Sequence, residues 1–396
     1  MAWTLQLATR AGARVGEIRN ARSRSFRFPL NRTPTVQFAI DAFHPLAPLA
    51  VQDDLYLVKA YDDSTGSKVL RACAPIVGHE KSRSSTGGTI TVTAAGPQSR
   101  LDRRLIGKHT AGATFGTTSL SMLDRGEIMG RIIDALNTGE NTNIFTRAGD
   151  TGIRRGTISP STPTYVSDWR YKGASEALAQ LSGTLDGPDW EIVPVEPVAD
   201  AIGVQIGALN VAPVIGQARA DVAFEFGGGR ANVAEWKEVG DASTLATEAT
   251  SLPPGFPDNA TADVVTWEDS AAIALRGLHE TVVPADLQVL DLRTKLVQDH
   301  VRVRKQPRKV ITFSPIAESS SLPASERRVP RPFVDYIVGD VIRFRATETF
   351  PVFDSAGTQT GVTTVKTVDA LMRIFAVQID LDDGGVASTS LTLQSE

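Results

Sequence analysis

The sequence predicts a mainly β protein with an α+β insertion: two tube-like β-barrel or sandwich domains plus inserted and linking α+β segments. Three observations predict this class. Short stretches near both ends of the chain alternate between apolar and polar residues, which is the period of a half-buried strand. The chain has 33 glycines and 22 prolines, enough to end many short elements. A region between the alternating stretches has the helical period instead.

The first hundred residues are the first strand-rich region. Alternation at 3–7 and 36–40 predicts strands, and the apolar run at 55–59 predicts another. A turn-forming run at 62–66 follows it, and residues 89–92 predict a further strand. Strands and turns at this close spacing are typical of a small barrel or sandwich.

The next hundred residues have a different pattern. Four apolar residues recur at the i, i+3, i+4, i+7 spacing of one helix face: Met129, Ile132, Ile133 and Leu136. Ser121 and Asp124 are both candidate N-caps for this helix. A second helix is predicted at 175–181, with Gly183 as its stop, and a strand is predicted at 188–193. This part of the chain therefore predicts an α+β insertion.

Strand character returns near 222–226. The stretch 241–258 is rich in Ser, Thr, Ala, Pro and Gly, and predicts a long loop. A helix is predicted to begin near Pro284 and to end at Pro307. Serines and prolines at 314–332 predict a second loop.

The last residues predict a closing hairpin. Residues 375–381 and 389–393 each alternate, and a turn with two aspartates and two glycines separates them. From these patterns we expect a discontinuous first β-domain, residues 1–104 with 203–235, and an insertion domain at 105–202. A linker and helix-containing segment at 236–325 then leads to 326–396, the C-terminal part of the second β-domain.

Composition excludes several classes of protein. The net charge of −4 is not that of a nucleic-acid-binding domain, which is usually clearly basic. The single cysteine, Cys73, allows neither an intramolecular disulfide nor a cysteine metal site. No stretch approaches the length of a membrane helix, and Gln6 and Arg10 interrupt the N-terminal apolar run, so we expect no signal peptide and no membrane insertion.

No motif for catalysis or metal binding is present. The five histidines lack the i, i+3 or i, i+4 spacing of a ligand pair: His44, His79, His109, His279 and His300. There is no G-x-S-x-G motif, and the glycine run at 227–229 lacks the Lys and Ser or Thr of a phosphate loop. Paired aspartates lie in predicted turns, where local hydrogen bonding favours them. We therefore expect no catalytic residues, no metal and no cofactor.

Charge is unevenly spread. Residues 10–32 carry seven arginines against one acidic residue, Glu17. This pattern indicates contact with an acidic surface, either a partner subunit or passing DNA, and the alternative is a set of solvated strand and helix faces. The candidate subunit interface consists of Arg19, Arg22, Arg24 and Arg27, with Asp263, Glu268 and Asp269 as acidic partners.

Several short stretches carry a family resemblance through their order and spacing. They are GEIRNA (16–21), FRFPLN (26–31), VQF (36–38), ALAQL (177–181), PDWEI (188–192), FEFGGGRAN (224–232), YIVGDV (336–341), MRIFAVQID (372–380) and LTL (391–393). Together they resemble the minor tail proteins of siphophages, especially those that infect actinobacteria. They resemble more distantly the baseplate hub proteins of contractile-tailed phages.

The resemblance implies a structural subunit of a phage tail tip and not an enzyme. It implies a homotrimeric ring in which each subunit carries two tube-like β-domains, so that three subunits present six similar faces to the six-fold tail tube. The implied partners are the distal tail ring, the tape measure protein and tip proteins. Genomic DNA would pass through the ring without specific binding. The protein would be assembled in the host cytoplasm and located in the virion, at the tail tip.

Three alternatives remain at this point. A distal tail ring or other baseplate protein would have another stoichiometry, since that ring is usually a hexamer. A carbohydrate-binding tail module favours exposed aromatic residues, and aromatic residues make up 6% of this chain. A cell-wall-degrading tail protein needs a catalytic set that the sequence does not contain. Within the hub interpretation the arginine segment predicts a subunit interface, because a channel that lets DNA slide should avoid strong phosphate binding.

Overall fold

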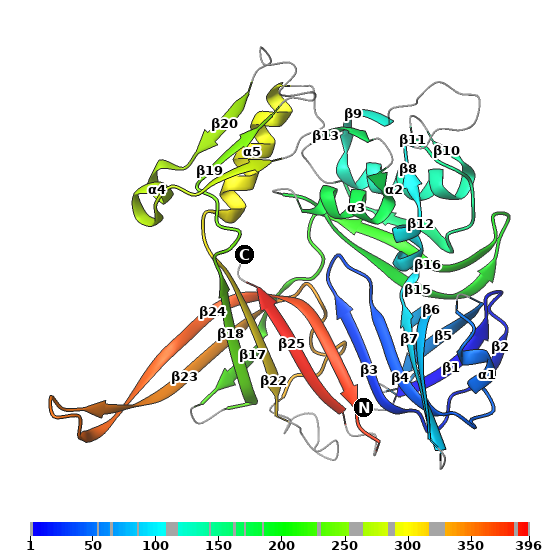
Figure 1. Cartoon of the computed structure of the whole chain (residues 1–396), viewed down its shortest axis with the longest axis horizontal. Coiled ribbons are helices and arrows are strands. Elements are labelled where there is room, and N and C mark those ends of the chain that lie inside the picture. The colour runs from blue at the N-terminus through cyan, green and yellow to red at the C-terminus, as the bar shows by residue number, and fades with distance from the viewer. Residues whose placement is uncertain are drawn as a thin grey trace.

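The computed structural model describes residues 3–53, 55–63, 66–84, 87–107, 118–141, 144–160, 164–169, 172–183, 186–227, 231–252, 264–283, 290–316, 329–383 and 387–394. It confirms the predicted class, a mainly β chain with an α+β insertion. Figure 1 shows two β regions side by side, with the insertion above the first region and a smaller α/β module above the second. A long two-stranded ribbon projects from the second β region.

The first β region is a curled sheet with the strand order β3-β4-β7-β6-β5-β1-β2. Its elements are β1 (Trp3–Thr9), β2 (Arg14–Glu17), β3 (Arg22–Pro29), β4 (Thr35–Asp41), α1 (Ala47–Ala50), β5 (Tyr56–Asp62), β6 (Val69–Ser84) and β7 (Gly87–Ala95). The predicted alternation positions the core, because Val36 and Phe38 point inward while Gln37 between them is exposed. Trp3 stacks on Phe26 at a ring-centroid distance of 4.4 Å and joins β1 to β3 across this core.

The insertion has its own core. Its elements are η1 (Pro97–Arg103), β8 (Leu105–Ile106), β9 (Thr118–Asp124), α2 (Arg125–Thr138), β10 (Glu140–Asn141), β11 (Ile144–Phe145), β12 (Ile153–Ile158), β13 (Thr164–Trp169), β14 (Lys172–Gly173), α3 (Ala174–Ser182), β15 (Asp189–Ala199) and β16 (Val204–Ala212). The apolar face of α2 is fully buried, as its spacing predicted. Of the two candidate caps, Asp124 is the N-cap and accepts from the Glu127 N–H at 3.0 Å, and α3 ends at Gly183.

The second β region contains β17 (Ala218–Phe226), β18 (Val233–Asp241), β22 (Arg308–Pro315), β23 (Val341–Phe353), β24 (Gln359–Leu381) and β25 (Ala387–Gln394). β24 pairs with β25 in the predicted closing hairpin, and β25 pairs with β22, which pairs with β18. β22 was not expected, because the sequence placed its residues in a linker. The strand forms because Ile311 and Phe313 alternate into the core beside Phe344.

A small α/β module lies between β18 and β22. It contains β19 (Glu248–Ser251), β20 (Val265–Glu268), α4 (Ser270–Arg276), β21 (Glu280–Val283) and α5 (Leu290–Arg304). The loop predicted at 241–258 is therefore interrupted by β19, which pairs with both β20 and β21. The start of the helix predicted near Pro284 lies outside the described residues, and so does most of the loop predicted at 314–332.

One long strand connects the two β regions. Residues 376–381 of β24 pair with β3, and Val377 lies opposite Phe28. All thirteen strands of the two regions therefore belong to one continuous sheet. Phe28 also meets Phe333 edge-on at 5.0 Å, which links the two regions through their side chains.

The strands within 203–235 pair differently from our expectation. We expected them to complete the first β-domain, but β16 pairs with β12 and β15 in the insertion, and β17 pairs with β23. Leu209 and Val211 of β16 bury their side chains in the insertion core. Alternation shows which face of a strand is buried but does not specify the neighbouring strand. It is therefore β24, and not a strand from 203–235, that pairs with β3.

Candidate assembly interface

The arginine-rich segment lies on β2, β3 and the turn between them. Phe26 and Phe28 are buried, whereas Arg27 between them is exposed, so the predicted division into an apolar and a basic face holds for this part of β3. Both edges of β3 are paired, one with β4 and the other with β24. Because its backbone is already occupied, β3 can contact a partner only through the side chains of its exposed face.

Part of this positive charge is balanced within the chain. Glu17 lies 3.5 Å from Arg19 and 3.7 Å from Arg14. The Arg24 guanidinium donates to the Asp382 carbonyl at 3.3 Å, next to the end of β24. Arg22 and Arg27 are exposed and are the members of the predicted set that most resemble contact residues.

The predicted acidic partners lie elsewhere. Glu268 ends β20 and is exposed, and Asp263 lies outside the described residues. Asp269 caps α4 by accepting from the Ala272 N–H at 2.9 Å, and it pairs with Lys305 at 3.0 Å. The backbone N–H of Ala272, and then the Lys305 ammonium, hold the pKa of Asp269 below its usual range.

The structure does not bring the two predicted sets together in one subunit. No hydrogen bond or ion pair joins the four arginines to Glu268 or Asp269 in the part of the chain that is described. The two sets belong to different modules, β3 in the first β region and β20 in the small α/β module (Figure 1). Any pairing between them would have to join different subunits, and the interface stays a prediction.

A second candidate surface, which the sequence did not suggest, is the projecting ribbon formed by residues 347–366. We name it the arm. β17 pairs with β23 only as far as Ala346, and β25 and β3 pair with β24 only from Arg373 onward. In the described part of the chain, the strands of the arm therefore have only each other as partners. Such a two-stranded ribbon is marginally stable in water on its own.

The composition of the arm is unusual for an exposed ribbon. Its surface carries exposed apolar side chains: Phe350, Val352, Phe353, Val362 and Val365. Asp354 is the one charged residue between Thr349 and Val365. The free edge strand β18 differs, since it has charges at Glu235, Lys237 and Glu238 that oppose unwanted pairing. The arm lacks this protection, which indicates a surface that is covered after assembly.

The insertion is tied to both β regions at one buried carboxylate. Asp189 at the start of β15 is 4% exposed. It accepts from Asn31 of the first β region at 2.8 Å and from the Ile215 N–H at 2.8 Å, and it pairs with Arg373 of β24. Arg373 also donates to the carbonyls of Gly339 and Ile215. This joint fixes the relative positions of three parts of the chain.

A second contact joins the insertion to the first β region. Glu196 of β15 accepts from Lys59 at 3.1 Å and from the Tyr61 hydroxyl at 2.7 Å. Burial disfavours the charged form of Lys59, but hydrogen bonds to Tyr61 and Glu196 outweigh it and raise the Lys59 pKa. Cys73 lies beside this contact, and burial raises the pKa of its thiol to about 12, so it is an unreactive packing residue.

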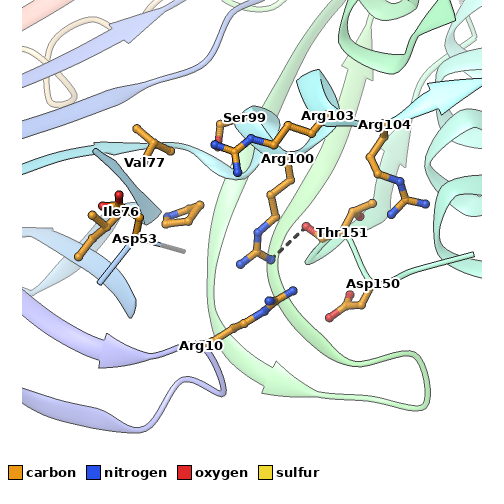
Figure 2. A pocket seen from close by; sticks show the side chains of 11 residues that line it. Arg10, Asp53, Ile76, Val77, Ser99, Arg100, Arg103, Arg104, Asp150 and Thr151 are labelled. Carbon is orange, nitrogen blue, oxygen red and sulfur yellow. Dashed lines mark hydrogen bonds between the residues drawn. The ribbon is translucent and has the colours of Figure 1, made fainter. Parts of the chain in front are cut away.

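A basic pocket lies where the insertion meets the first β region. Four arginines from two places line it: Arg10 in the turn after β1, and Arg100 and Arg103 on η1 with Arg104 directly after it (Figure 2). The cavity measures about 180 Å³. Its acidic lining residues are Asp53 and Asp150.

The described residues contain no cluster of three or more His, Cys, Asp or Glu side chains that could hold a metal ion. Of the histidines, His79 lies 3.3 Å from Asp53, whereas His300 lies on α5 beside Arg304. Among the described helices, none is both long enough and apolar enough to cross a membrane.

No protein-family model matches the chain, and no curated protein matches it. Solved structures do. A tail protein from Neisseria meningitidis MC58 superposes with a TM-score of 0.56 at 10% identity, covering 100% of this chain and 97% of that one. The 43 kDa tail protein of prophage MuSo2 from Shewanella oneidensis superposes with a TM-score of 0.57 at 11% identity, covering 99% and 98%.

The chain has the fold of these two tail proteins. Both comparisons span nearly the whole of each chain, so the insertion and the small module belong to the shared fold along with the two β regions. At such low identity no residue role can be carried over from either protein.

Proposed function

We propose that this chain is a structural subunit of a phage tail tip, a baseplate hub ring that joins the tail tube to the host-contacting tip. The observation that carries the proposal is the full-length correspondence with two phage tail proteins, in which nearly all of each chain is matched. An added catalytic or carbohydrate-binding domain would leave part of this chain unmatched. The siphophage resemblance of the short sequence stretches points to the same role.

The arrangement of the β regions supports a ring of three subunits. Each subunit places two β regions side by side and connects them through β24, as expected if each region is one of the two tube-like domains. Three such subunits would present six β-domains to a six-fold tail tube. The partners of the ring would be the distal tail ring, the tape measure protein and tip proteins, and DNA would pass through without specific binding.

The proposed role is not enzymatic. A cell-wall hydrolase needs a nucleophile, a base or a metal held in one cleft. The basic pocket is lined mainly by arginines. Arginine is protonated throughout the physiological pH range and therefore does not act as a base or a nucleophile. Clearing of a cell-wall substrate by the pure protein, abolished by one substitution, would contradict this part of the proposal.

We assign the arm to contacts with a second copy of the chain. A nearly uncharged ribbon needs an apolar counterpart, and the described part of the chain exposes separate apolar side chains such as Val214 and Leu278. In a closed ring each arm meets the same surface on the next subunit. Seven residues of β23 extend about 24 Å at the rise of an antiparallel strand, enough to reach a neighbour.

The mass of the soluble assembly tests the proposal. Light scattering or native mass spectrometry should give three subunits, whereas six would indicate a distal tail ring. The double variant Phe350→Ser/Phe353→Ser should lose the trimer and stay folded, because both side chains are exposed in the single subunit. A monomeric wild type at tail-forming concentrations, or a variant that still forms the trimer, would refute the assigned role of the arm.

The arginine interface has a separate test. Charge reversal in Arg22→Glu/Arg24→Glu should weaken assembly while far-ultraviolet circular dichroism stays unchanged. The matched control is Lys81→Glu/Arg83→Glu on exposed β6, which should assemble normally. Unchanged assembly together with reduced, salt-sensitive DNA retention would replace the interface with a nucleic-acid contact.

A further inference from the structure

The basic pocket at the insertion boundary brings together arginines from separate elements. Arg10 follows β1, and its backbone N–H is held by the Leu55 carbonyl at 3.1 Å. Arg100 and Arg103 come from η1 in the insertion. Figure 2 shows the guanidinium groups of Arg10 and Arg100 pointing toward each other across the cavity. Two like charges that converge in this way repel each other unless an anion lies between them.

The carboxylates at the pocket are already engaged. Asp150 accepts from the N–H groups of Val204 and Gly152, both at 2.9 Å, and from Arg154 at 2.9 Å. Burial raises the pKa of Asp150, but these three hydrogen bonds outweigh it and hold that pKa below its usual range. Asp53 lies 3.3 Å from His79. Neither carboxylate makes an ion pair with a pocket arginine in the described structure.

The four arginines differ in the hydrogen bonds that they make within the chain. Arg104 donates to the carbonyls of Gly149 at 2.9 Å and Leu136 at 2.8 Å, so it has a structural role. Arg100 donates to the Thr151 carbonyl at 3.3 Å. Arg10 and Arg103 are exposed, and no ion pair engages either of them among the described residues. These two can turn toward a ligand at little cost.

Positive charge continues next to the pocket. A shallower hollow of about 310 Å³ shares Arg103 and Arg104 with it and adds Arg147. Burial, and then the charge of Arg147, lower the pKa of Arg104. An arginine whose protonation is disfavoured by a neighbouring arginine marks a region of positive potential.

We propose that this pocket binds one oxyanion group, a phosphate or a carboxylate, between Arg10 and the η1 arginines. Guanidinium groups present paired N–H donors that match the oxygen atoms of these groups, and such hydrogen bonds are charge-assisted. A cavity of about 180 Å³ holds a single such group with water and is smaller than the pockets that enclose whole nucleotides or drug-sized ligands. The bound group would bridge the first β region to the insertion.

Titration of the pure protein with inorganic phosphate tests the proposal. Calorimetry at constant ionic strength, with chloride as the balancing anion, should show saturable binding at one site per subunit. Phosphate should also raise the thermal unfolding midpoint, because it binds only the folded chain. A parallel titration with acetate tests the carboxylate. Binding of phosphate alone identifies a phosphate site, and binding of both extends the site to carboxylate groups, including an acidic side chain of another tail protein.

Variants locate the site. Arg10→Gln/Arg103→Gln should weaken phosphate binding by roughly tenfold or more, the size expected for lost charge-assisted hydrogen bonds. Arg10→Lys keeps the charge but loses the paired donors, so its affinity should be intermediate. Arg83→Gln/Arg276→Gln removes two exposed arginines elsewhere and should bind as the wild type does. Absence of saturable binding of either anion, or equal binding by the Arg10→Gln/Arg103→Gln variant, would overturn the proposal.

Discussion

The two α/β modules of this chain differ in how much apolar surface they bury. The insertion packs α2 and α3 on the sheet β12-β16-β15, and 18 of its described residues form a buried core. The small module packs α5 on the sheet β20-β19-β21, and five of its described residues form a buried core. It also exposes large apolar side chains, with Leu275 at 77%. A core of five residues supports a fold only marginally, so contacts outside the module must matter more to it.

The modules also differ in their polar ties to the rest of the chain. Asp189 and Glu196 fasten the insertion to both β regions. The small module leaves and rejoins the second β region through β18 and β22, and the ion pair Lys305–Asp269 lies within it. We therefore expect the insertion to unfold together with the β regions and the small module to open at lower denaturant concentration. Four changes test this difference.

The largest effect is expected at the Asp189 joint. Asp189→Ala leaves the Arg373 guanidinium partly buried without its carboxylate, so the free energy of unfolding should fall by about 3–5 kcal/mol. Asp221→Ala is the control, since its pair with Arg219 is exposed and such surface pairs contribute little to stability. Urea unfolding followed by tryptophan fluorescence measures both. Equal stability of the two variants would show that Asp189 is not a joint.

Truncation of the insertion core should be nearly as severe. Leu136→Ala opens a cavity under α2 and should lower the free energy of unfolding by about 2–5 kcal/mol. Leu275→Ala in the small module removes an exposed side chain and should change it by less than about 0.5 kcal/mol in the isolated subunit. If Leu275→Ala impairs ring assembly instead, the exposed face of the small module is a contact surface.

Loss of a helix cap should have a smaller effect that depends on the module. Asp124→Ala and Asp269→Ala each remove one N-cap hydrogen bond, so each should lower stability less than the two changes above. Hydrogen exchange should show faster exchange across the whole small module in Asp269→Ala, because its core is small. In Asp124→Ala the change should stay within the first turns of α2. If exchange rises only near the cap in both variants, the two modules do not differ in local stability as we expect.

The smallest effect is a pH dependence of the small module. Burial, and then the charge of Arg304, lower the pKa of His300 on α5 to about 4, below its usual value near 6.5. The unfolded chain therefore binds a proton that the folded chain does not, and stability should decline as the pH falls from about 6.5 to about 4. His300→Gln should flatten this part of the stability curve. A variant with the wild-type pH dependence would contradict the assignment to His300.

Local elements were predictable where one short pattern carried all the information. The stripe of α2, its cap at Asp124 and the stop of α3 at Gly183 depend on neighbours within one or two turns. The closing hairpin depends on alternation and a glycine turn in the same way. β22 was missed because Pro307 and the serines after it resemble a linker, and its strand exists only because β18 and β25 flank it.

The candidate sites also differ in how much of each could be predicted from the sequence. The sequence showed the arginine-rich segment, but it could not show that β3 lies in the middle of the sheet or that Asp269 caps α4. It gave no sign of the basic pocket, because Arg10 and Arg100 are ninety positions apart and meet only after the insertion packs on the first β region. The sequence did contain a signal for the arm: a seventeen-residue stretch whose one charged residue is Asp354.

The sequence by itself determined the mainly β class, the helices of the insertion and the position of several strands, because these follow from periods of 2 and 3.6 residues. Only the tertiary structure decided which strands are neighbours. Strand pairing uses backbone groups that every residue carries, so side-chain patterns cannot identify the partner. For that reason the use of β24 by both β regions, the joint at Asp189 and the pocket at Arg10 appear only in the folded chain.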